Sequence, residues 1–424
     1  MINHKIIKNV LSALFGSTST AALTFISIPM LVKGIGVEDY GKLAILLSTQ
    51  IIFQTLFSFQ PWQALIKFWY DEKYKKKNIL SYAILMDILS CSIGVISLYF
   101  FLNSSLFAGM FFYVEKQVVF FLSIAMIFNI NSIFIGMCRI GDEFLLIAFS
   151  DFLRAFTRFI GAFLVMKSGN LSDYIFWFFV SGFTSFIIYP LIKFNVLMMA
   201  LVNVFKLDSS DIKPAINFCK FSFFVALKGI IDLPVQHMDK YLVSYLLGNA
   251  SVAVFDVSKR INQGFGVFIN VANQVFFPKV SAWLSVSPSH LIWYKGVKIS
   301  FTLATFVITM CMLSYCIDDI VFVYYNEIFD MNESSYYFSK YYTSVFLISS
   351  SFIFIHIFFL AKGYVKQDVK FLVFTNCIYL LLCFFGMKYF GLYSIVIAYA
   401  FQVISVLAFK FIYTNNKIKE VTHE

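Results

Sequence analysis

Charged side chains inside long apolar runs are the residues of this sequence that could carry chemistry. A charge at the centre of a membrane helix costs roughly 2.5–3.5 kcal/mol on insertion scales. Such charges must therefore face a wet cavity, pair with one another, or lie near the membrane interfaces. The charged residues in such runs are Arg154, Arg158, Lys228, Lys240, Lys259, Arg260, Asp87, Asp151, Asp232, Asp239 and Asp256.

Several of these charges are spaced for pairing along a single helix. Opposite charges three or four residues apart lie on one helical face and partly neutralise each other. Structural pairing and a role in transport are both open for these groups. The pairs at such spacing are Asp151–Arg154, Lys228–Asp232, Asp256–Lys259 and Asp256–Arg260.

Arg158 follows Arg154 by one helical turn, and local pairing does not account for it. Two guanidinium groups on one face repel each other unless an anion or water lies between them. A pyrophosphate is such an anion, and the guanidinium fork matches its oxygens bidentately. We predict an anion-binding cavity at these two arginines, with Lys228, Lys259 and Arg260 as further cationic members.

Acids and prolines in the same runs suggest coupling and gating groups. Buried carboxylates with cationic neighbours can couple transport to an ion gradient. The candidates are Asp232, Asp239 and Asp256, with Asp232 first, although a fixed ion pair between Asp232 and Lys228 is the stronger interpretation. Proline removes a backbone donor and bends a helix, so Pro29 and Pro234 are predicted gating positions.

The composition of the chain identifies lipid as its solvent. Of 424 residues, 60% are hydrophobic and 13% charged, against about 45–50% and about 25% in soluble domains. The net charge of +10 is scattered between apolar runs, which argues against nucleic acid as a partner. No GxxxxGK[ST] motif, HExxH motif or CxxC pair occurs. We therefore expect no ATP use, no cofactor or metal and no enzymatic activity.

Twelve apolar runs are long enough to cross a bilayer as helices, which need about 20 residues each. Most Lys and Arg residues outside the runs fall on one side, which predicts that both termini are cytoplasmic. That orientation requires an even number of spans, and ten would also satisfy it. The runs are 10–32, 43–65, 79–102, 117–138, 144–166, 174–192, 216–246, 252–278, 291–316, 337–361, 369–387 and 392–413.

Two similar stretches indicate an internal repeat. The first run ends in IPMLVKGIGVEDYGKLAI and the seventh in LPVQHMDKYLVSYLLGNASVAVFDV. Gly36 and Gly248 within them are separated by half the chain length. We therefore predict an all-α polytopic membrane protein with two six-helix bundles, residues 1–214 and 215–424, related by a pseudo-twofold axis along the membrane normal.

At these residues the chain resembles the O-antigen and polysaccharide-unit flippases of the Wzx type, within the multidrug/oligosaccharidyl-lipid/polysaccharide exporter superfamily. The resemblance rests on Pro29 with GIGVEDYG, on MDKYLVSYLLGNASVAVFDVSKRI, and on Pro278 at the end of the eighth run. It extends over the whole chain in length and number of runs. Phe255 departs from the tyrosine that relatives commonly carry, so a hydroxyl role there is unsupported.

The resemblance implies a secondary transporter of the bacterial inner membrane. It would move polyprenyl-pyrophosphate-linked oligosaccharide units from the cytoplasmic to the periplasmic leaflet by alternating access. Its implied partners are that substrate, membrane lipid and other membrane proteins of polysaccharide assembly. A multidrug/cation antiporter of the same fold is the main alternative. A polysaccharide polymerase is a weaker one, because the chain has no long external loop between its runs.

Overall fold

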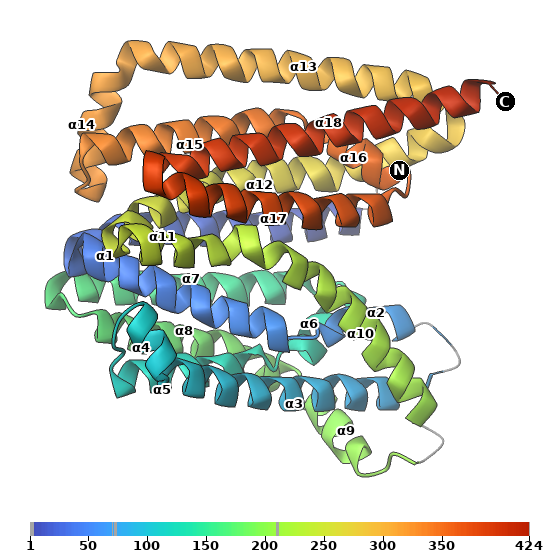
Figure 1. Ribbon diagram of the computed structural model, residues 1–424. Coiled ribbons are helices and arrows are strands. Elements are labelled where there is room, and N and C mark those ends of the chain that lie inside the picture. The colour runs from blue at the N-terminus through green and yellow to red at the C-terminus, as the bar shows by residue number, and fades with distance from the viewer. Residues whose placement is uncertain (1–3, 70, 72–73, 209–211, 424) are drawn as a thin grey trace. The chain divides into compact units, whose positions relative to one another are not determined.

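The computed structural model describes residues 4–69, 71, 74–208 and 212–423, and all regular elements in these ranges are helical (Figure 1). Long apolar runs without access to water can satisfy their backbone groups only within helices. Each of the twelve predicted runs lies largely in helical segments. The elements are α1 (His4–Phe57), α2 (Pro61–Trp69), α3 (Lys76–Leu102), α4 (Ser105–Met110), α5 (Lys116–Ile124), η1 (Ala125–Asn129), α6 (Ser132–Ile140), α7 (Phe144–Ser168), α8 (Leu171–Ile192), α9 (Phe194–Val204), α10 (Ile212–Leu233), η3 (Pro234–Met238), α11 (Asp239–Leu247), α12 (Asn249–Val286), α13 (Ser289–Leu313), η4 (Ser314–Ile317), α14 (Asp318–Phe329), α15 (Glu333–Ser351), α16 (Ile353–Ala361), α17 (Val365–Phe390) and α18 (Tyr393–His423).

The chain divides into two compact units. The N-terminal unit ends at Leu233 and the C-terminal unit begins at Pro234. The boundary falls between α10 and η3, inside the seventh predicted run. In the N-terminal unit, α1 packs along α7 and α7 along α8. In the C-terminal unit, α12 packs against α11, α15 and α16, and α17 pairs with α18.

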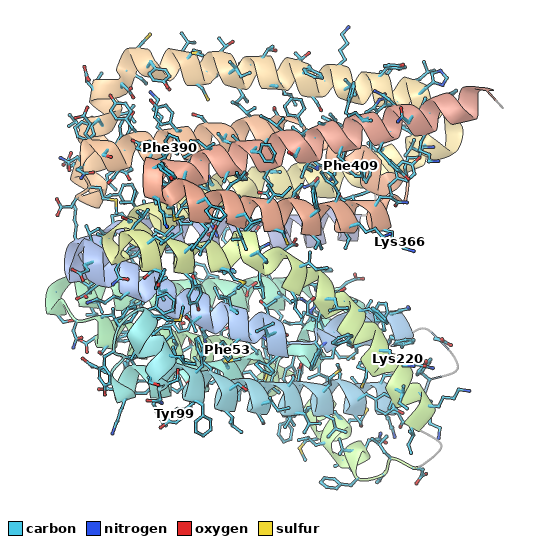
Figure 2. All side chains as sticks on the ribbon, in the orientation of Figure 1. Phe53, Tyr99, Lys220, Lys366, Phe390 and Phe409 are labelled. Atoms are coloured by element: carbon cyan, nitrogen blue, oxygen red, sulfur yellow. The ribbon has the colours of Figure 1, made fainter. Side chains whose placement is uncertain are left out.

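By length and composition, seven segments of the described chain can cross a membrane, or eight if a pair bent by 45° (Glu333–Ser351 and Ile353–Ala361) counts as one span. Phe15–Trp69 is counted as one such segment although it holds two predicted runs. The total of twelve spans therefore stays a prediction. Exposed apolar side chains, such as Tyr99 on α3 and Phe390 on α17, are suited to contact with lipid (Figure 2).

Gly36 and Gly248 share one unusual backbone conformation. Gly36 has φ 83° and ψ 162°, and Gly248 has φ 84° and ψ 171°. Side chains with a Cβ rarely adopt this region, so glycine suits both positions. Gly36 breaks α1, and Gly248 separates α11 from α12. The two halves thus carry the same turn half a chain length apart, in agreement with the internal repeat.

The two prolines have different local effects. Pro29 lies inside α1. The residue of α1 with non-helical φ and ψ is not Pro29 but Gly36, farther along the chain. Pro234 begins η3, one turn of π-helix between α10 and α11. Its ring cannot donate to the carbonyl one turn earlier, which explains why the regular helix ends at Leu233. Only the second proline therefore coincides with a break in its helix.

The fourth span of each predicted half is also interrupted. In the first half, 3₁₀-helical η1 and a turn separate α5 from α6. There Gln54 of α1 donates to the side-chain oxygen of Asn129 over 2.8 Å. In the second half, α15 and α16 meet at the 45° bend. Interrupted spans at corresponding positions of two halves often mark the binding region of a transporter.

Candidate functional site

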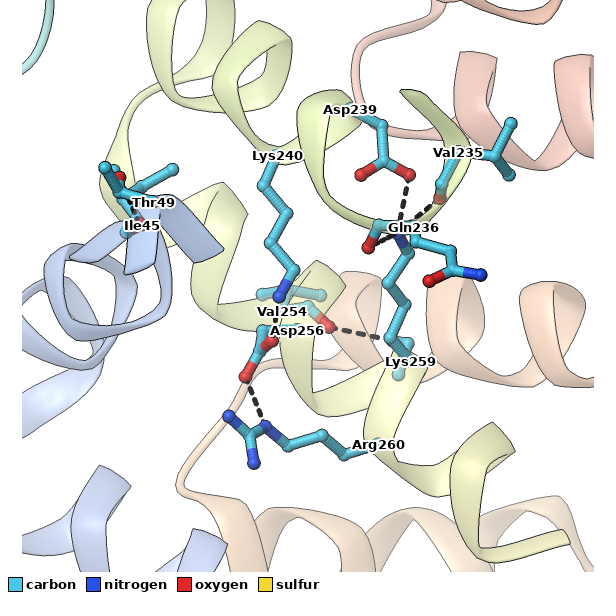
Figure 3. A network of polar contacts seen from close by, with 11 residues as sticks. Ile45, Thr49, Val235, Gln236, Asp239, Lys240, Val254, Asp256, Lys259 and Arg260 are labelled. Carbon is cyan, nitrogen blue, oxygen red and sulfur yellow. Dashed lines mark hydrogen bonds and ion pairs between the residues drawn. The ribbon is translucent and has the colours of Figure 1, made fainter. Parts of the chain in front are cut away.

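Five charged residues of the C-terminal unit form two neighbouring groups of ion pairs on α11 and α12, here called the charged network (Figure 3). The two helices pack against each other across the turn at Gly248. Residues at similar chain distances before and after that turn therefore meet. The network consists of Asp239 and Lys240 on α11 and Asp256, Lys259 and Arg260 on α12.

Asp256 binds two cations, one with each carboxylate oxygen. Lys240 Nζ lies 2.5 Å from Oδ1, and Arg260 Nε donates to Oδ2 over 2.6 Å. Asp256 is 1% exposed and Lys240 6% exposed. The ion pair with Arg260 was expected from the spacing along α12. The pair with Lys240 joins two helices, and spacing alone does not indicate it.

Lys259 binds Asp239 rather than taking the place expected for it beside Asp256. Its Nζ donates to Asp239 Oδ2 over 2.6 Å. The hydroxyl of Tyr379, on α17, donates to the same oxygen over 3.2 Å. Oδ1 of this fully buried carboxylate has no hydrogen-bond partner among the residues that the structure describes. The second oxygen of Asp239 is thus an acceptor without a donor from the described chain.

Lys259 also stabilises the π-helical turn. Its Nζ donates to the backbone carbonyls of Val235, over 2.9 Å, and Gln236, over 3.1 Å. A turn that departs from the α-helix loses regular backbone partners, and in a membrane these must be replaced from within the protein. Lys259 thus bonds at once to a candidate coupling carboxylate and to the turn that follows Pro234.

The positions of the N-terminal half that correspond to the charged network carry no charge. Half a chain length before the five network residues stand Ser27, Ile28, Ala44, Leu47 and Ser48. Four of these five side chains are buried, and Leu47 is partly buried. Neutral side chains therefore fill these positions in the first half, where the second half has ions.

Arg154 and Arg158 lie on one face of α7 in the N-terminal unit, directed at α8. Arg154 donates to the hydroxyl of Ser185 from Nε, over 3.2 Å, and from Nη2, over 2.9 Å. Arg158 Nε donates to Ser181 Oγ over 3.1 Å, and its guanidinium lies 4.3 Å from the centre of the Phe178 ring. Both arginines are partly buried. Neutral hydroxyls thus hold the two cations one turn apart.

Arg154 does not form the ion pair that its spacing from Asp151 suggests. In the described part of the chain, its hydrogen bonds go to Ser185, and no carboxylate lies within ion-pair distance of it. Hydrogen bonds to a hydroxyl orient a guanidinium without adding a negative charge, and Asp151 acts on Arg154 electrostatically without an ion pair at contact distance. That arrangement suits the capture of an anion.

The remaining predicted site residues are not in the network. Asp232 lies in the last turn of α10, at the end of the N-terminal unit, and is partly buried. The backbone at Lys228 is helical, but its side chain lies outside the described residues. The expected pair between these two residues therefore stays a prediction.

A second buried ionic cluster in the C-terminal unit was not expected from the sequence. Lys410 of α18 is 4% exposed, and its Nζ lies 2.8 Å from both Asp368 Oδ1 and His356 Nδ1. Asp368 and Lys410 stand near the ends of predicted runs, where charges usually face the interface. The apolar neighbours of Lys410 in the sequence were the available signal. Among the described residues, no group of three His, Cys, Asp or Glu side chains is placed to hold a metal ion.

Comparisons with known proteins identify a family from the sequence and, separately, a fold from the structure. The profile of a family described as polysaccharide biosynthesis protein matches residues 6–283. An inward-facing multidrug resistance MATE family transporter of the MOP superfamily has a TM-score of 0.73 and 12% identity, covering 95% of this chain and 96% of that one. The lipid II flippase MurJ in an inward closed conformation has a TM-score of 0.69 and 16% identity, covering 96% and 87%.

A third solved structure represents the opposite state of this fold. It is an outward-facing MATE family transporter with a TM-score of 0.62 and 12% identity, covering 99% of this chain and 96% of that one. At such identities the likeness establishes the fold alone. The proteins that share the fold are transporters and a flippase, not enzymes. No curated protein sequence gives a significant match.

Proposed function

The chain belongs to the family of polysaccharide biosynthesis proteins, and from this membership we propose that it flips polyprenyl-pyrophosphate-linked oligosaccharide units from the cytoplasmic to the periplasmic leaflet. The protein is a multi-pass membrane protein with the fold of MOP-superfamily transporters. The proposed location is the bacterial inner membrane. The proposed substrate class is the O-antigen or a similar surface polysaccharide, delivered to the other membrane proteins of its assembly.

The observation that carries the substrate proposal is the arginine pair of α7. Arg154 and Arg158 are held one turn apart by Ser185 and Ser181. Two guanidinium groups so placed match the oxygens of a diphosphate. Because Arg154 bonds to a hydroxyl and not to a carboxylate, its charge favours an anionic ligand over a cationic drug. A multidrug/cation antiporter with this fold remains the alternative, because MATE transporters share the fold.

We propose alternating access of the two halves as the mechanism. Proteins of this fold are known in inward-facing and outward-facing conformations, which supports the proposal. For coupling to an ion gradient, the contacts favour Asp239 over Asp232 and Asp256. Each carboxylate oxygen of Asp256 already binds a cation, Lys240 or Arg260. Asp239 Oδ1, by contrast, has no hydrogen-bond partner in the described chain. A proton or a cation would bind at that oxygen.

The first prediction concerns the substrate. Cells that lack this protein are expected to accumulate the lipid-linked oligosaccharide in the cytoplasmic leaflet, because the diphosphate and sugars cannot cross hydrocarbon unaided. Leaflet position is measured by whether an impermeant oxidant or lectin reaches the sugars in intact spheroplasts. Restoring the gene should expose them. Sugars that are accessible without the protein, together with lost efflux of cationic dyes, would contradict the flippase proposal and favour the antiporter.

The second prediction concerns coupling. Reconstituted protein is expected to transport faster when an ion gradient is imposed, and Asp239→Asn should abolish the acceleration because the amide carries no charge for the ion to neutralise. The assay compares rates with and without proton and sodium gradients. Tyr379→Phe is the matched control, since it removes one hydrogen bond to Asp239 but no charge, and should keep the response. A normal gradient response in Asp239→Asn would exclude this carboxylate.

A further inference from the structure

A pocket of about 380 Å³ lies within the C-terminal unit, between the end of α12, the beginning of α13, and α16. Its size falls within the range of about 300–1,000 Å³ that is typical of small-molecule sites. Most of its lining is apolar and comes from Trp283, Leu291, Ile299, Phe354 and Phe358. None of the transport residues considered above lines it. The pocket is therefore separate from the residues considered for transport.

One cation lines this otherwise apolar pocket. Lys295 and Ser287 are both exposed and supply its polar part. Lys295 lies on α13, less than two helical turns after that helix begins at Ser289. With a rise of about 1.5 Å per residue, its Cα lies about 9 Å from the helix start. A lysine so close to the end of a span can place its ammonium at the depth of lipid headgroups.

The inner wall of the pocket is firmly packed. Phe358 and Val280 belong to a buried apolar cluster that includes Trp293. The indole nitrogen of Trp293 donates to the side-chain oxygen of Asn415 over 2.7 Å, which fixes α13 against α18. The pocket is thus preformed, and a ligand would not need to open it. Little conformational entropy is lost in such binding.

One side of α13 is exposed in the part of the C-terminal unit that the structure describes. Beside the pocket, Leu291, Tyr294 and Ile299 of this helix are 49%, 63% and 43% exposed. A membrane protein covers such a surface with lipid. Trp283 and Leu291 are themselves about half exposed at the pocket. Lipid molecules therefore have direct access to the pocket from the bilayer.

We propose that this pocket binds one acyl chain of an anionic phospholipid of the bilayer, with the lipid phosphate at Lys295. The apolar lining fits a single hydrocarbon chain, and the one lysine complements one negative headgroup. Basic residues between helices near the membrane surface bind anionic headgroups in this way. The site goes beyond the proposed transport function, because the bound lipid belongs to the membrane and is not carried across it.

Three substitutions in and beside the pocket test the lipid proposal. Lys295→Gln removes the charge but keeps the length of the side chain. Gly296 also lines the pocket, and a Cβ there would lie 3.7 Å from Phe354 Cβ, an ordinary contact. Gly296→Leu should therefore be tolerated and should fill the pocket. Lys298→Gln is the matched control, since Lys298 is an exposed lysine of α13 that does not line the pocket.

The test uses the purified full-length protein in vesicles that contain phosphatidylglycerol or phosphatidylcholine with a photoreactive acyl chain. We expect labelling of peptides from the end of α12 and the beginning of α13. Phosphatidylglycerol should label about five-fold more than phosphatidylcholine, the factor expected for one lysine at an anionic surface. Lys295→Gln should remove this preference and Gly296→Leu should remove the labelling, whereas Lys298→Gln should change neither.

Three results would overturn the proposal. The first is equal labelling by the two lipids in the wild-type protein. The second is a preference for phosphatidylglycerol that survives in Lys295→Gln, which keeps the test decisive even if Gly296→Leu fails to fold. The third is displacement of the label by stoichiometric polyprenyl phosphate, which would assign the pocket to the transported lipid. Loss of flipping in cells would bear on the proposed function and not on this site.

Discussion

Transport of the lipid-linked oligosaccharide is expected to fall about 100-fold or more when Arg154 and Arg158 are both replaced by glutamine. A hydrogen bond to a charged group contributes about 1.5–3 kcal/mol, so two lost anion contacts together give at least this factor. The protein should remain in the membrane, because glutamine can still donate to the hydroxyls of Ser185 and Ser181. The measurement is the rate of flipping in vesicles, normalised to the amount of protein.

Two further variants make this result specific. Arg139→Gln removes an arginine of the same unit whose guanidinium lies 3.9 Å from the centre of the Trp62 ring. It should transport at nearly the wild-type rate. Replacing Arg154 and Arg158 with lysine keeps both charges but loses the bidentate fork, and an intermediate rate is expected. Full transport by the double glutamine variant would remove the pair from the binding site.

Exchanging part of the charged network for the residues of the first half is expected to separate stability from transport. Asp256→Ala alone leaves Lys240 and Arg260 without their shared carboxylate, at a cost of about 3–5 kcal/mol. The triple variant Lys240→Ile, Asp256→Ala and Arg260→Ser installs the residues found half a chain length earlier. Its melting temperature should return close to that of the wild type. Transport should be abolished in the triple variant, as in Asp256→Ala.

Each alternative outcome has a definite meaning. A triple variant that melts as early as Asp256→Ala would show that this helix pair needs its ions in order to fold. A stable triple variant with normal transport would reduce the network to a replaceable structural element. Melting is measured in detergent and transport in vesicles. The two quantities are thereby obtained on the same purified protein.

The sequence predicted the helices well because their cause is local. Runs of about 20 apolar residues have few alternatives in lipid, and each predicted run lies largely in helical segments. The pair Asp256–Arg260 was also predictable, because four residues separate its members on one helix. Gly36 and Gly248 were recognisable as a repeat, and their similar backbone angles agree with it.

The rest depends on contacts between helices, which spacing does not encode. Lys259 could have paired with Asp256 on its own helix, and only the packing of α11 against α12 brings it to Asp239. Tyr379 reaches the same carboxylate from α17. The serines that hold the arginines are ordinary small residues in an apolar run of α8. Nothing in their sequence context distinguishes them from packing residues.

Three short helices also appear between the predicted runs. α4, α9 and α14 all lie outside the twelve runs. Helices of this length depend on packing more than on intrinsic propensity. For α14 a signal was present, since Asp318 and Asp319 stand in its first turn, where negative charge favours a helix N-terminus.

The double attachment of Lys259 has a thermodynamic consequence. The same ammonium bonds Asp239 and the carbonyls of the π-helical turn, and the chain passes from one compact unit to the other at the start of that turn. An ion that neutralises Asp239 weakens its hold on Lys259 and so alters the donors available to the turn. Ion binding therefore shifts the conformational equilibrium of the turn by some factor. By linkage, a rearrangement of the turn changes the affinity of Asp239 for the ion by that same factor.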